Sequence, residues 1–284
     1  MSYSTFSLMV EEKVAQLTLS RPDKLNSLTL TFFQELLAVC HELERRSEVR
    51  ALVISSTGKH FTAGLDLQAL GALAGELIDG ERSRAAYSLR TCVRELQESI
   101  SAVEKLRIPV LIAIHGGCIG GGVDLATACD LRYCTQDAFF CVQETNVGIV
   151  ADLGTLQRLP RLIPDGAARE MCFTGRRLPA DRALALGLVS AVYPDQQSML
   201  SEVRKTALEI ASKSPLVTAG IKDVLNYGRD HGVRDGLEYI AVWQSGMLSA
   251  QDVMEQAAAK GGGRPPSYAE LPPPKDLLGS PQVK

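Results

Sequence analysis

The stretch that most constrains the fold is a glycine-rich loop between an apolar run and a helix-like segment. Residues 109–114 (PVLIAI) predict a strand, five glycines follow among the seven residues 116–122, and residues 123–128 predict a helix. Glycine reaches dihedrals that a Cβ forbids and lets the backbone approach a ligand closely. The first N–H groups of the helix are unpaired and lie at the positive end of its dipole. The loop therefore predicts a site for a ligand oxygen that gains negative charge.

A second glycine turn precedes this one. Residues 51–56 (ALVISS) predict a strand that leads through TGKHFTAG into a helix from Asp66, and this order of strand, turn and helix predicts an α/β architecture. The turn after Gly64 and the turn at Gly121 each present N–H groups where two donors could converge on one oxygen. Such an oxyanion hole loses about 3 kcal/mol of transition-state stabilisation when one donor is removed. The alternative is that both are ordinary strand-to-helix turns.

The rest of the chain contributes more helix than strand. A strand is predicted at 13–20, and the helix after it is predicted to be capped by Asn26 or Ser27. Residues 70–82 contain a predicted loop. Apolar spacing predicts the remaining elements as helices at 30–46, 85–105, 166–173, 179–186, 197–212, 215–228 and 233–258, with a strand at 188–193.

Composition excludes several classes of partner. A chain of 284 residues with 45% hydrophobic content can hide about 75% of its unfolded surface, which suits one large domain or a domain with an added helical part. The 30 basic and 33 acidic side chains, with a net charge of −3, do not predict the basic stripe that nucleic-acid binding requires. The sequence has no run of 18 apolar residues, so no membrane span is expected.

Cysteine and histidine usage favours neither disulfides nor a metal. Seven cysteines without a CxxC pair are typical of a reducing compartment, and the four histidines have no metal-ligand spacing. The N-terminus lacks a secretory pattern and the C-terminal SPQVK lacks a peroxisomal address. We therefore expect a cytoplasmic protein, or an organellar one if an import sequence has been removed.

Three carboxylates lie in apolar sequence around or after the glycine loop. They are Asp124, Glu144 and Asp152, and burial of such groups raises the pKa and suits general acid–base work. Each also has a structural interpretation. Asp124 could favour the positive end of its own helix, Glu144 could be exposed at a strand end, and Asp152 could cap a helix that begins near Gly154. The motif GGCIGGG is not a GxGxxG fingerprint, so a dinucleotide site is not favoured.

Taken together, these motifs resemble those of the enoyl-CoA hydratase/isomerase (crotonase) superfamily. The similarity covers about residues 5–258 through RPDKLNSL, GKHFTAGLDL, the stretch from PVLIAIHGG to DLRYC, and LPADRALALGLVSAVYP, in the family's order. Within it the chain is most similar to the Δ3,5-Δ2,4-dienoyl-CoA isomerases, because their acidic positions match Asp124, Glu144 and Asp152. The hydratases of the family have Glu at the first position and a glycine-rich turn at the third.

This resemblance implies an architecture and an assembly. It implies a crotonase-like spiral of ββα turns, placed here at 1–195, and a C-terminal helical region at 196–258 used in trimer contacts. It also implies a homotrimer or a homohexamer made of two trimers. Residues 259–284 are rich in Pro and Gly, and this composition predicts a disordered tail or an extended arm.

The resemblance also implies substrate contacts. The N–H groups of Leu65 and Gly121 would bind the thioester oxygen of an acyl-CoA. The surroundings of coenzyme A would include Lys24, with Ala63, Gly64 and Asp66 as further substrate-binding residues. No cofactor is implied, because coenzyme A is part of the substrate.

Chemistry gives the acids a task. Moving a 3,5-diene into conjugation with a thioester removes a proton from C2 and adds one at C6, which two carboxyl groups can do without metal or redox cofactor. We assign Glu144 as the base at C2, Asp152 as the acid at C6 and Asp124 as a group that polarises or orients its neighbours, which places the protein in unsaturated fatty-acid oxidation. Two alternatives remain open: a 2-enoyl-CoA hydratase in which Asp124 and Glu144 hold a water, and a non-catalytic acyl-CoA-binding protein.

Overall fold

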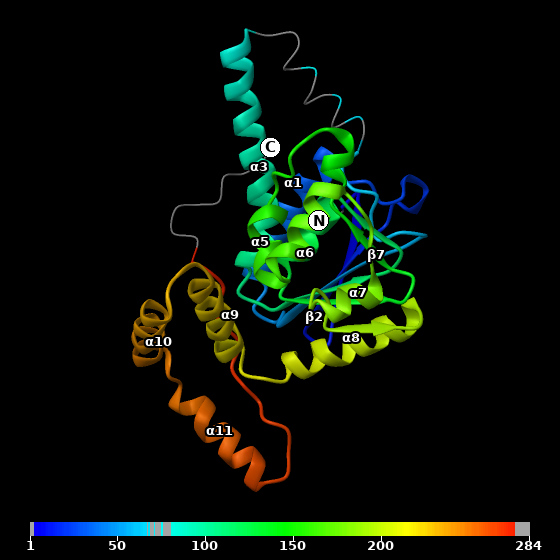
Figure 1. Cartoon of the computed structure of the whole chain (residues 1–284). Coiled ribbons are helices and arrows are strands. Elements are labelled where there is room, and N and C mark those ends of the chain that lie inside the picture. The colour runs from blue at the N-terminus through cyan, green and yellow to red at the C-terminus, as the bar shows by residue number, and fades with distance from the viewer. Residues whose placement is uncertain (1–2, 67, 69–70, 72–74, 76–80, 276–284) are drawn as a thin grey trace.

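A six-stranded sheet forms the centre of the computed structural model, which describes residues 3–66, 68, 71, 75 and 81–275 (Figure 1). The first two strands form an antiparallel hairpin and every later neighbour in this sheet is parallel. The strands, in their spatial order, are β1 (Phe6–Glu11), β2 (Val14–Leu19), β3 (Ala51–Ser56), β4 (Val110–Ile114), β6 (Leu131–Thr135) and β9 (Ala191–Tyr193). The predicted α/β class is thus confirmed, and β1 is a strand that the sequence did not predict.

A smaller sheet lies beside the first. It contains β5 (Gly117–Ile119), β7 (Phe139–Cys141) and β8 (Leu178–Pro179). Two isolated parallel bridges extend the same layer, one between Thr62 and Cys118 and one between Leu28 and Leu65. Strands β2, β3, β4 and β6 of the large sheet are thus each followed by a short extended segment in the second layer. This repetition is the spiral that the resemblance implies.

Helices cover both faces of the large sheet. Leu52 and Ile54 of β3 face a core that also contains residues of α1 (Leu30–Arg45), α3 (Arg82–Lys105) and α4 (Gly121–Ala128). Ala51 and Val53 face the opposite core, which α8 (Gln196–Ala211) completes. Strands buried on both faces carry continuous apolar runs, which explains why the strands at 51–56 and 110–114 could be predicted.

The predicted cap of α1 was wrong. The N-cap is Thr29, whose hydroxyl accepts a hydrogen bond from the Phe32 N–H at 3.2 Å. Asn26 has a positive φ of 52° and uses its side chain on the backbone of the preceding turn and of residues 57–60. Ser27 donates instead to Asp66 at 2.8 Å. Both residues therefore hold the turn rather than the helix.

The remaining helices are mostly where their spacing places them. They are α5 (Thr155–Leu162), α6 (Asp165–Thr174), α7 (Ala180–Ala185), α9 (Pro215–Asp230), α10 (Val233–Met247) and α11 (Ala250–Gly261). The single helix predicted over 233–258 was wrong, because the chain breaks at Leu248 and Ser249 caps α11 by accepting from the Asp252 N–H at 3.1 Å. The helix from Asp66 and the loop in 70–82 fall largely outside the described residues.

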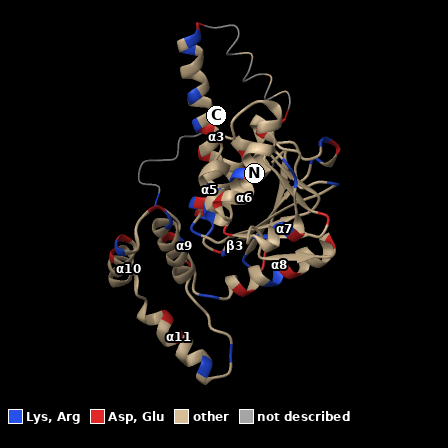
Figure 2. Cartoon of the chain, in the orientation of Figure 1, with Lys and Arg blue, Asp and Glu red and all other residues tan. Residues whose placement is uncertain are grey.

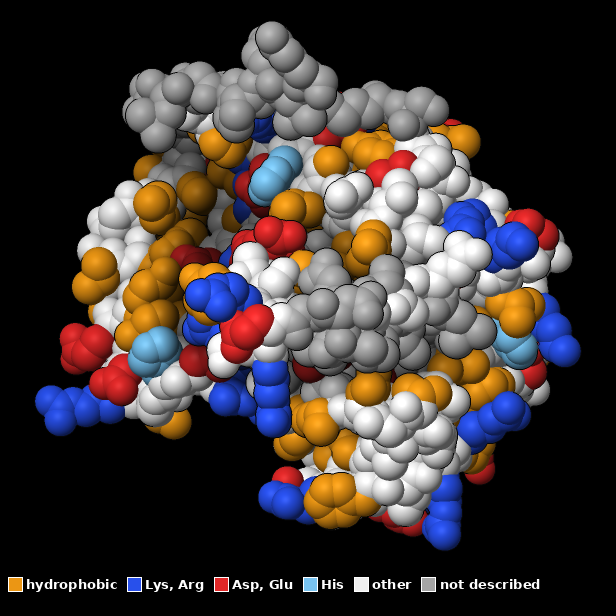
Figure 3. Space-filling model, turned by 90° about the horizontal axis from the view of Figure 1, so that it is seen from above, with side chains coloured by type: hydrophobic (Ala, Val, Ile, Leu, Met, Phe, Trp, Pro, Cys, Tyr) orange, Lys and Arg blue, Asp and Glu red, His pale blue; other side chains and the backbone are white. Residues whose placement is uncertain are grey.

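The last three helices extend away from the sheet (Figure 1). Their sides carry exposed apolar residues, namely Val217, Ile221, Leu225, Val233, Leu237, Val242, Met247, Leu248, Val253 and Met254. We name this set the C-terminal apolar surface. Hydrophobic side chains also gather along one flank of the hollowed face seen in Figure 3.

After α11 the chain returns to the sheet as an extended arm, described to residue 275. Arg50, which is 4% exposed, forms an ion pair with Glu270 at 2.9 Å and donates to the Tyr268 carbonyl at 2.9 Å. Lys13 pairs with the same Glu270 at 2.7 Å. Ion pairs of Glu270 with the buried Arg50 and the exposed Lys13 therefore hold this part of the tail. The domain limits at 195 and 258 stay predictions.

Candidate active site

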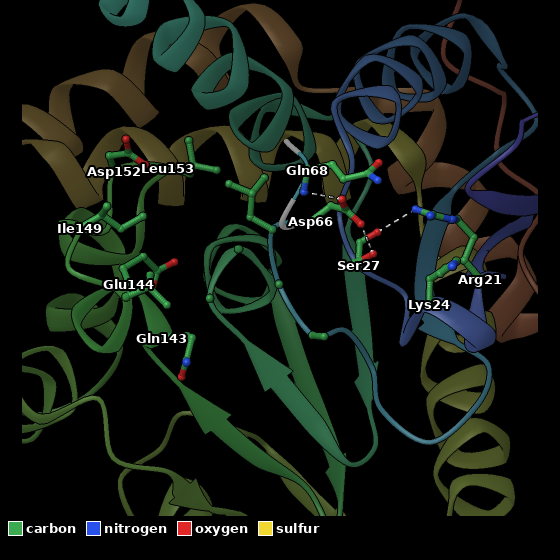
Figure 4. A pocket seen from close by; sticks show the side chains of 16 residues that line it. Arg21, Lys24, Ser27, Asp66, Gln68, Gln143, Glu144, Ile149, Asp152 and Leu153 are labelled. Carbon is green, nitrogen blue, oxygen red and sulfur yellow. Dashed lines mark hydrogen bonds between the residues drawn. The ribbon is translucent and has the colours of Figure 1, made fainter. Parts of the chain in front are cut away.

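A cavity of about 600 Å³ opens where the two glycine turns meet (Figure 4). The first turn and the residues before α1 form one side, and the segment that contains Glu144, Ile149 and Asp152 forms the other. The lining residues are Arg21, Lys24, Ser27, Ala63, Gly64, Leu65, Asp66, Gln68, Gly120, Gly121, Gln143, Glu144, Val147, Ile149, Asp152 and Leu153. Of the residues predicted for the site, Asp124 alone does not line this cavity.

Backbone contacts hold the two glycine turns together. The Thr62 N–H donates to the Gly117 carbonyl at 3.0 Å, and the Ile119 N–H donates back to the Thr62 carbonyl at 3.2 Å. Gly64 has a φ of +87°, and a Cβ there would lie 2.8 Å from the Ile119 oxygen. Only glycine permits this approach.

The two predicted donors are unpaired at the cavity. Leu65 and Gly121 both line it, and within the described part of the chain neither backbone N–H donates a hydrogen bond. The N–H groups of two neighbouring residues are occupied, since the Asp66 N–H donates to the Leu28 carbonyl and the Gly120 N–H donates to the Cys141 carbonyl. The arrangement leaves two N–H groups at the cavity that are free to donate hydrogen bonds to a ligand oxygen.

Glu144 lies beside the second turn, on the short 3₁₀ helix η2 (Gln143–Val147). Its Oε1 is 3.2 Å from the position that a Cβ on Gly120 would take. Its Oε2 is buried and finds no partner among the described residues. Burial, together with the charges of Asp124 and Asp152, raises the pKa of Glu144 to about 7. The carboxyl can therefore exist in both protonation states near neutral pH.

Asp152 is the second carboxylate of the cavity wall and lies in the segment between η2 and α5. Asp152 is exposed as a residue, but its carboxyl group is partly desolvated. This desolvation raises the pKa of the carboxyl. Figure 4 shows Asp152 and Glu144 on the same side of the cavity, across from Lys24 and Arg21. Two carboxyls with raised pKa values thus share one wall.

Asp124 is 1% exposed and lies behind that wall. Its Oδ1 accepts a hydrogen bond at 2.7 Å from the N–H of Thr155. Thr155 is the first residue of α5. Burial raises the pKa of Asp124 to about 6, against the effect of the hydrogen bond from the Thr155 N–H. The idea that Asp152 caps α5 was wrong, because Gly154 is the N-cap and Asp124 supplies the acceptor from another helix.

Several residues of the cavity were not among those predicted for the site. Ser27 bonds to Asp66 and so ties the residues before α1 to the first glycine turn. Arg21 donates to the Ser27 carbonyl at 3.1 Å and lines the mouth with Lys24. Both lie in the motif RPDKLNSL, which could have drawn attention to them. Val147 and Ile149 form an apolar part of the wall and are themselves exposed.

The other candidate groups are structural in the described part of the chain. His115 is buried and its Nε2 lies 2.8 Å from the Gly58 carbonyl oxygen. All seven cysteines are free, and burial raises the pKa of the Cys118 thiol well above its usual range. Among the described residues, no group of three His, Cys, Asp or Glu could hold a metal, and no helix is long and apolar enough to cross a membrane.

Comparison with known proteins places the chain in a family. The family described as enoyl-CoA hydratase/isomerase matches residues 9–258. A human protein named Delta(3,5)-Delta(2,4)-dienoyl-CoA isomerase, mitochondrial, is 43% identical over 260 residues, which cover 91% of this chain and 79% of the relative. An Arabidopsis thaliana protein named as the peroxisomal form of that isomerase is 41% identical over 274 residues, which cover 95% of this chain and 99% of the relative.

Solved structures show the same fold. An enoyl-CoA hydratase from Bacillus anthracis is 29% identical, superimposes with a TM-score of 0.83 and covers 93% of this chain and 99% of that one. The expected crotonase-like spiral with C-terminal helices is thereby confirmed. The chain belongs to the enoyl-CoA hydratase/isomerase family.

Proposed function

We propose that the protein converts 3,5-dienoyl-CoA to 2,4-dienoyl-CoA. The observation that carries the proposal is that Glu144 and Asp152 line one cavity together with the two unpaired N–H groups of Leu65 and Gly121. A proton acceptor, a proton donor and two donors for a developing oxyanion are what this isomerisation requires. The names of the relatives agree with this activity.

The reaction begins at the thioester. With its oxygen held by the Leu65 and Gly121 N–H groups, removal of a C2 proton by Glu144 moves the C2–H electrons toward that oxygen and gives an extended dienolate. When the electrons return from that oxygen, the C3=C4 and C5=C6 double bonds shift to C2=C3 and C4=C5, and C6 takes the proton of Asp152, which becomes ionised. The two N–H groups stabilise the dienolate more than the substrate, and this difference accelerates the reaction.

Geometry supports the division of roles between the acids. Glu144 lies against Gly120, next to the proposed oxyanion donor Gly121, so its carboxyl would lie close to the carbon next to a thioester bound there. Asp152 lies further along the same wall, as the acid for the distant C6 should. Because both pKa values are raised, one proton shared between the two carboxyls gives the ionised base and the protonated acid together.

Asp124 then has a positioning role. It does not reach the cavity, and its Oδ1 accepts the first N–H of α5, three residues after Asp152. Its negative charge, when it is ionised, also helps to raise the pKa of Glu144. Asp124 would thus orient and polarise its neighbours rather than exchange protons with the substrate.

The rest of the substrate would extend to both sides of the reacting carbons. Lys24 and Arg21 offer positive charge at the mouth for the phosphates of coenzyme A, with Ala63, Gly64 and Asp66 beside the thioester. Val147, Ile149 and Leu153 offer an apolar wall for the acyl chain. Proton transfer within one molecule moves no electrons to an acceptor, so the mechanism requires no cofactor.

A direct assay separates this function from its alternatives. Purified protein is offered a 3,5-dienoyl-CoA and, separately, a 2-enoyl-CoA. Gain of conjugated-dienoyl absorbance supports the isomerase, loss of enoyl absorbance supports a hydratase, and no change in either supports a non-catalytic binder. In an isomerase, Glu144→Gln and Asp152→Asn should each lower turnover by roughly 10²–10⁴-fold.

We also propose that the chain assembles as a homotrimer or as a hexamer of two trimers. The C-terminal apolar surface contains ten large hydrophobic residues that are between 49% and 82% exposed, more than a monomer usually leaves in one region. Light scattering on the purified protein tests the assembly. A monomeric mass at micromolar concentration would contradict it.

The location of the protein follows its relatives. The human and Arabidopsis proteins are named mitochondrial and peroxisomal, and neither name supports the cytoplasmic expectation. We propose the organellar alternative. Fractionation of cells that express the full-length protein tests this proposal.

A further inference from the structure

A second cavity, of about 470 Å³, lies on the other side of the segment that contains Asp152. Asp152 and Leu153 line both cavities, so these two residues form the wall between them. The other residues of the second cavity are nearly all polar or charged. They are Gln97, Ser101, Glu104, Gly154, Gln157, Arg158, Arg161, Arg229 and Asp230. An acyl chain would find little apolar surface there.

Side chains of the second cavity hold the backbone of this wall. Gln97 of α3 donates from Nε2 to the Asp152 carbonyl at 2.6 Å. Arg158 of α5 approaches the Leu153 carbonyl with Nη1 at 3.4 Å. Gly154 has a φ of +129°, and a Cβ there would lie 1.8 Å from the same Nη1. The guanidinium therefore lies directly against the backbone at Gly154.

Arg158 is itself fixed. Its Nε and Nη2 donate to the two carboxylate oxygens of Glu104 at 3.2 and 3.0 Å, and Nη2 also donates to the Ser101 hydroxyl at 3.1 Å. The side chains of Arg158 and Glu104 are 12% and 16% exposed. Burial acts to raise the pKa of Glu104, but the hydrogen bonds and charge of Arg158 and Arg229 lower it. Two parallel hydrogen bonds between a guanidinium and a carboxylate fix the orientation of the Arg158 guanidinium.

The ionic cluster also reaches the C-terminal helices. Arg229 of α9 bonds to Glu104, and Arg161 of α5 forms an ion pair with Asp230 at 3.2 Å. Figure 2 shows charges of both signs gathered where α5 lies beside α9. Helices α3, α5 and α9 therefore meet at the outer side of the wall that presents Asp152.

The Asp152 side chain has no comparable support. Its carboxyl accepts no hydrogen bond from another described residue, and residues 151–154 form no helix or strand. The position of the carboxyl therefore depends on how its backbone is held. The contacts that restrain this backbone come from the second cavity and, through Thr155, from Asp124.

We propose that Gln97 and Arg158, the latter held by Glu104, are positioning residues that keep the Asp152 carboxyl within reach of the substrate carbon that receives its proton. This inference rests on the proposed isomerase function. A misplacement of about 1 Å at a reacting group can cost on the order of 100-fold in rate. The three residues should therefore affect the second proton transfer more than the first, which belongs to Glu144 and the two N–H groups.

The test measures the two proton transfers separately. A 3,5-dienoyl-CoA with deuterium at C2 is incubated in ordinary water, and mass spectrometry follows both product formation and loss of deuterium from unreacted substrate. Loss of deuterium reports the first transfer followed by return, and product formation reports delivery at C6. In Gln97→Met, which keeps the length of the side chain but cannot donate, the ratio of deuterium loss to product should rise about tenfold.

A matched control uses the same cavity. Gln157 lines it and is exposed, and in the described structure its side chain makes no hydrogen bond. Gln157→Met should leave both rates and their ratio at the wild-type value. Arg158→Lys keeps a positive charge beside Glu104 but cannot bond at two points, so it should raise the ratio as Gln97→Met does.

Three results would overturn the inference. One is an unchanged ratio in both Gln97→Met and Arg158→Lys while the wild type is active. Another is an equal loss of both rates together with a lower melting temperature, since general damage does not change the ratio. A wild-type protein that makes no product from 3,5-dienoyl-CoA removes the proposed function as well, and so is distinguished from the first two results.

Discussion

Replacing Glu144 with Gln should stabilise the protein at alkaline pH while it lowers turnover by roughly 10²–10⁴-fold. The pKa of Glu144 is raised from 4.5 to about 7, because the ionised form is buried next to Asp124 and Asp152. The folded state then binds the proton more tightly than the unfolded state. Between these two pKa values the stability of the wild type must fall as pH rises. A glutamine at this position has no proton to lose.

The size of the effect follows from the shift. Each pKa unit corresponds to about 1.4 kcal/mol, so the full effect is on the order of 3 kcal/mol above pH 7. At pH 5.5 the Glu144 carboxyl is already mostly ionised in the unfolded state, so part of the stability loss has occurred. Roughly 2 kcal/mol of the loss in wild-type stability remains to appear between pH 5.5 and 8. Both figures are upper values, because Glu144 is not fully buried and solvent screens its charge.

Urea unfolding at pH 5.5 and pH 8, at one fixed protein concentration, measures this effect. The stability difference between Glu144→Gln and the wild type should grow by about 2 kcal/mol toward the higher pH. Glu170→Gln is the control, since Glu170 is an exposed residue of α6 outside the cavity. Parallel pH dependence of wild type and Glu144→Gln would refute the reasoning that burial holds the proton on Glu144.

Two further predictions concern the oxyanion donors and the assembly. Gly64→Ala should lower kcat by roughly 10²–10³-fold, because a Cβ at a φ of +87° displaces the turn that presents the Leu65 N–H. The affinity for free coenzyme A should change little. Steady-state kinetics measure kcat, and calorimetry measures the affinity. Leu237→Asp, at a position that is 63% exposed on α10, should reduce the mass in light scattering to that of a monomer while the far-UV circular dichroism stays unchanged.

The parts of the site that the sequence predicted depend on short stretches of chain. The five glycines at 116–122 indicate backbone conformations that other residues rarely adopt. In the structure, Gly116 and Gly120 do have positive φ values. Long strands with continuous apolar runs were equally visible. The strands β5, β7 and β8 have only two or three residues, so no alternation can identify them.

Contacts between residues far apart in the chain could not be predicted, because they produce no periodic pattern in the sequence. The hydrogen bond from Gln97 to the Asp152 carbonyl spans 55 positions, and the pair of Arg158 with Glu104 spans 54. Asp124 was assigned to its own helix or to catalysis, and its bond to the N-terminus of α5 became visible only in three dimensions. Periodicity also joined α10 and α11, since only Leu248 and the capping Ser249 separate two segments with the same spacing.

The polar groups of the site are distributed unequally between its two sides. On the outer side the carbonyls of Asp152 and Leu153 are bonded by Gln97 and Arg158, and on the inner side the Leu65 and Gly121 N–H groups and one oxygen of Glu144 are unpaired. A buried polar atom without a partner costs about 1–3 kcal/mol. A bound thioester oxygen would satisfy the two N–H groups, and the C2 proton would satisfy Glu144. The fold therefore restrains the backbone of Asp152 through its outer bonds, and leaves unpaired at the cavity the two N–H groups and the Glu144 oxygen that the substrate can pair.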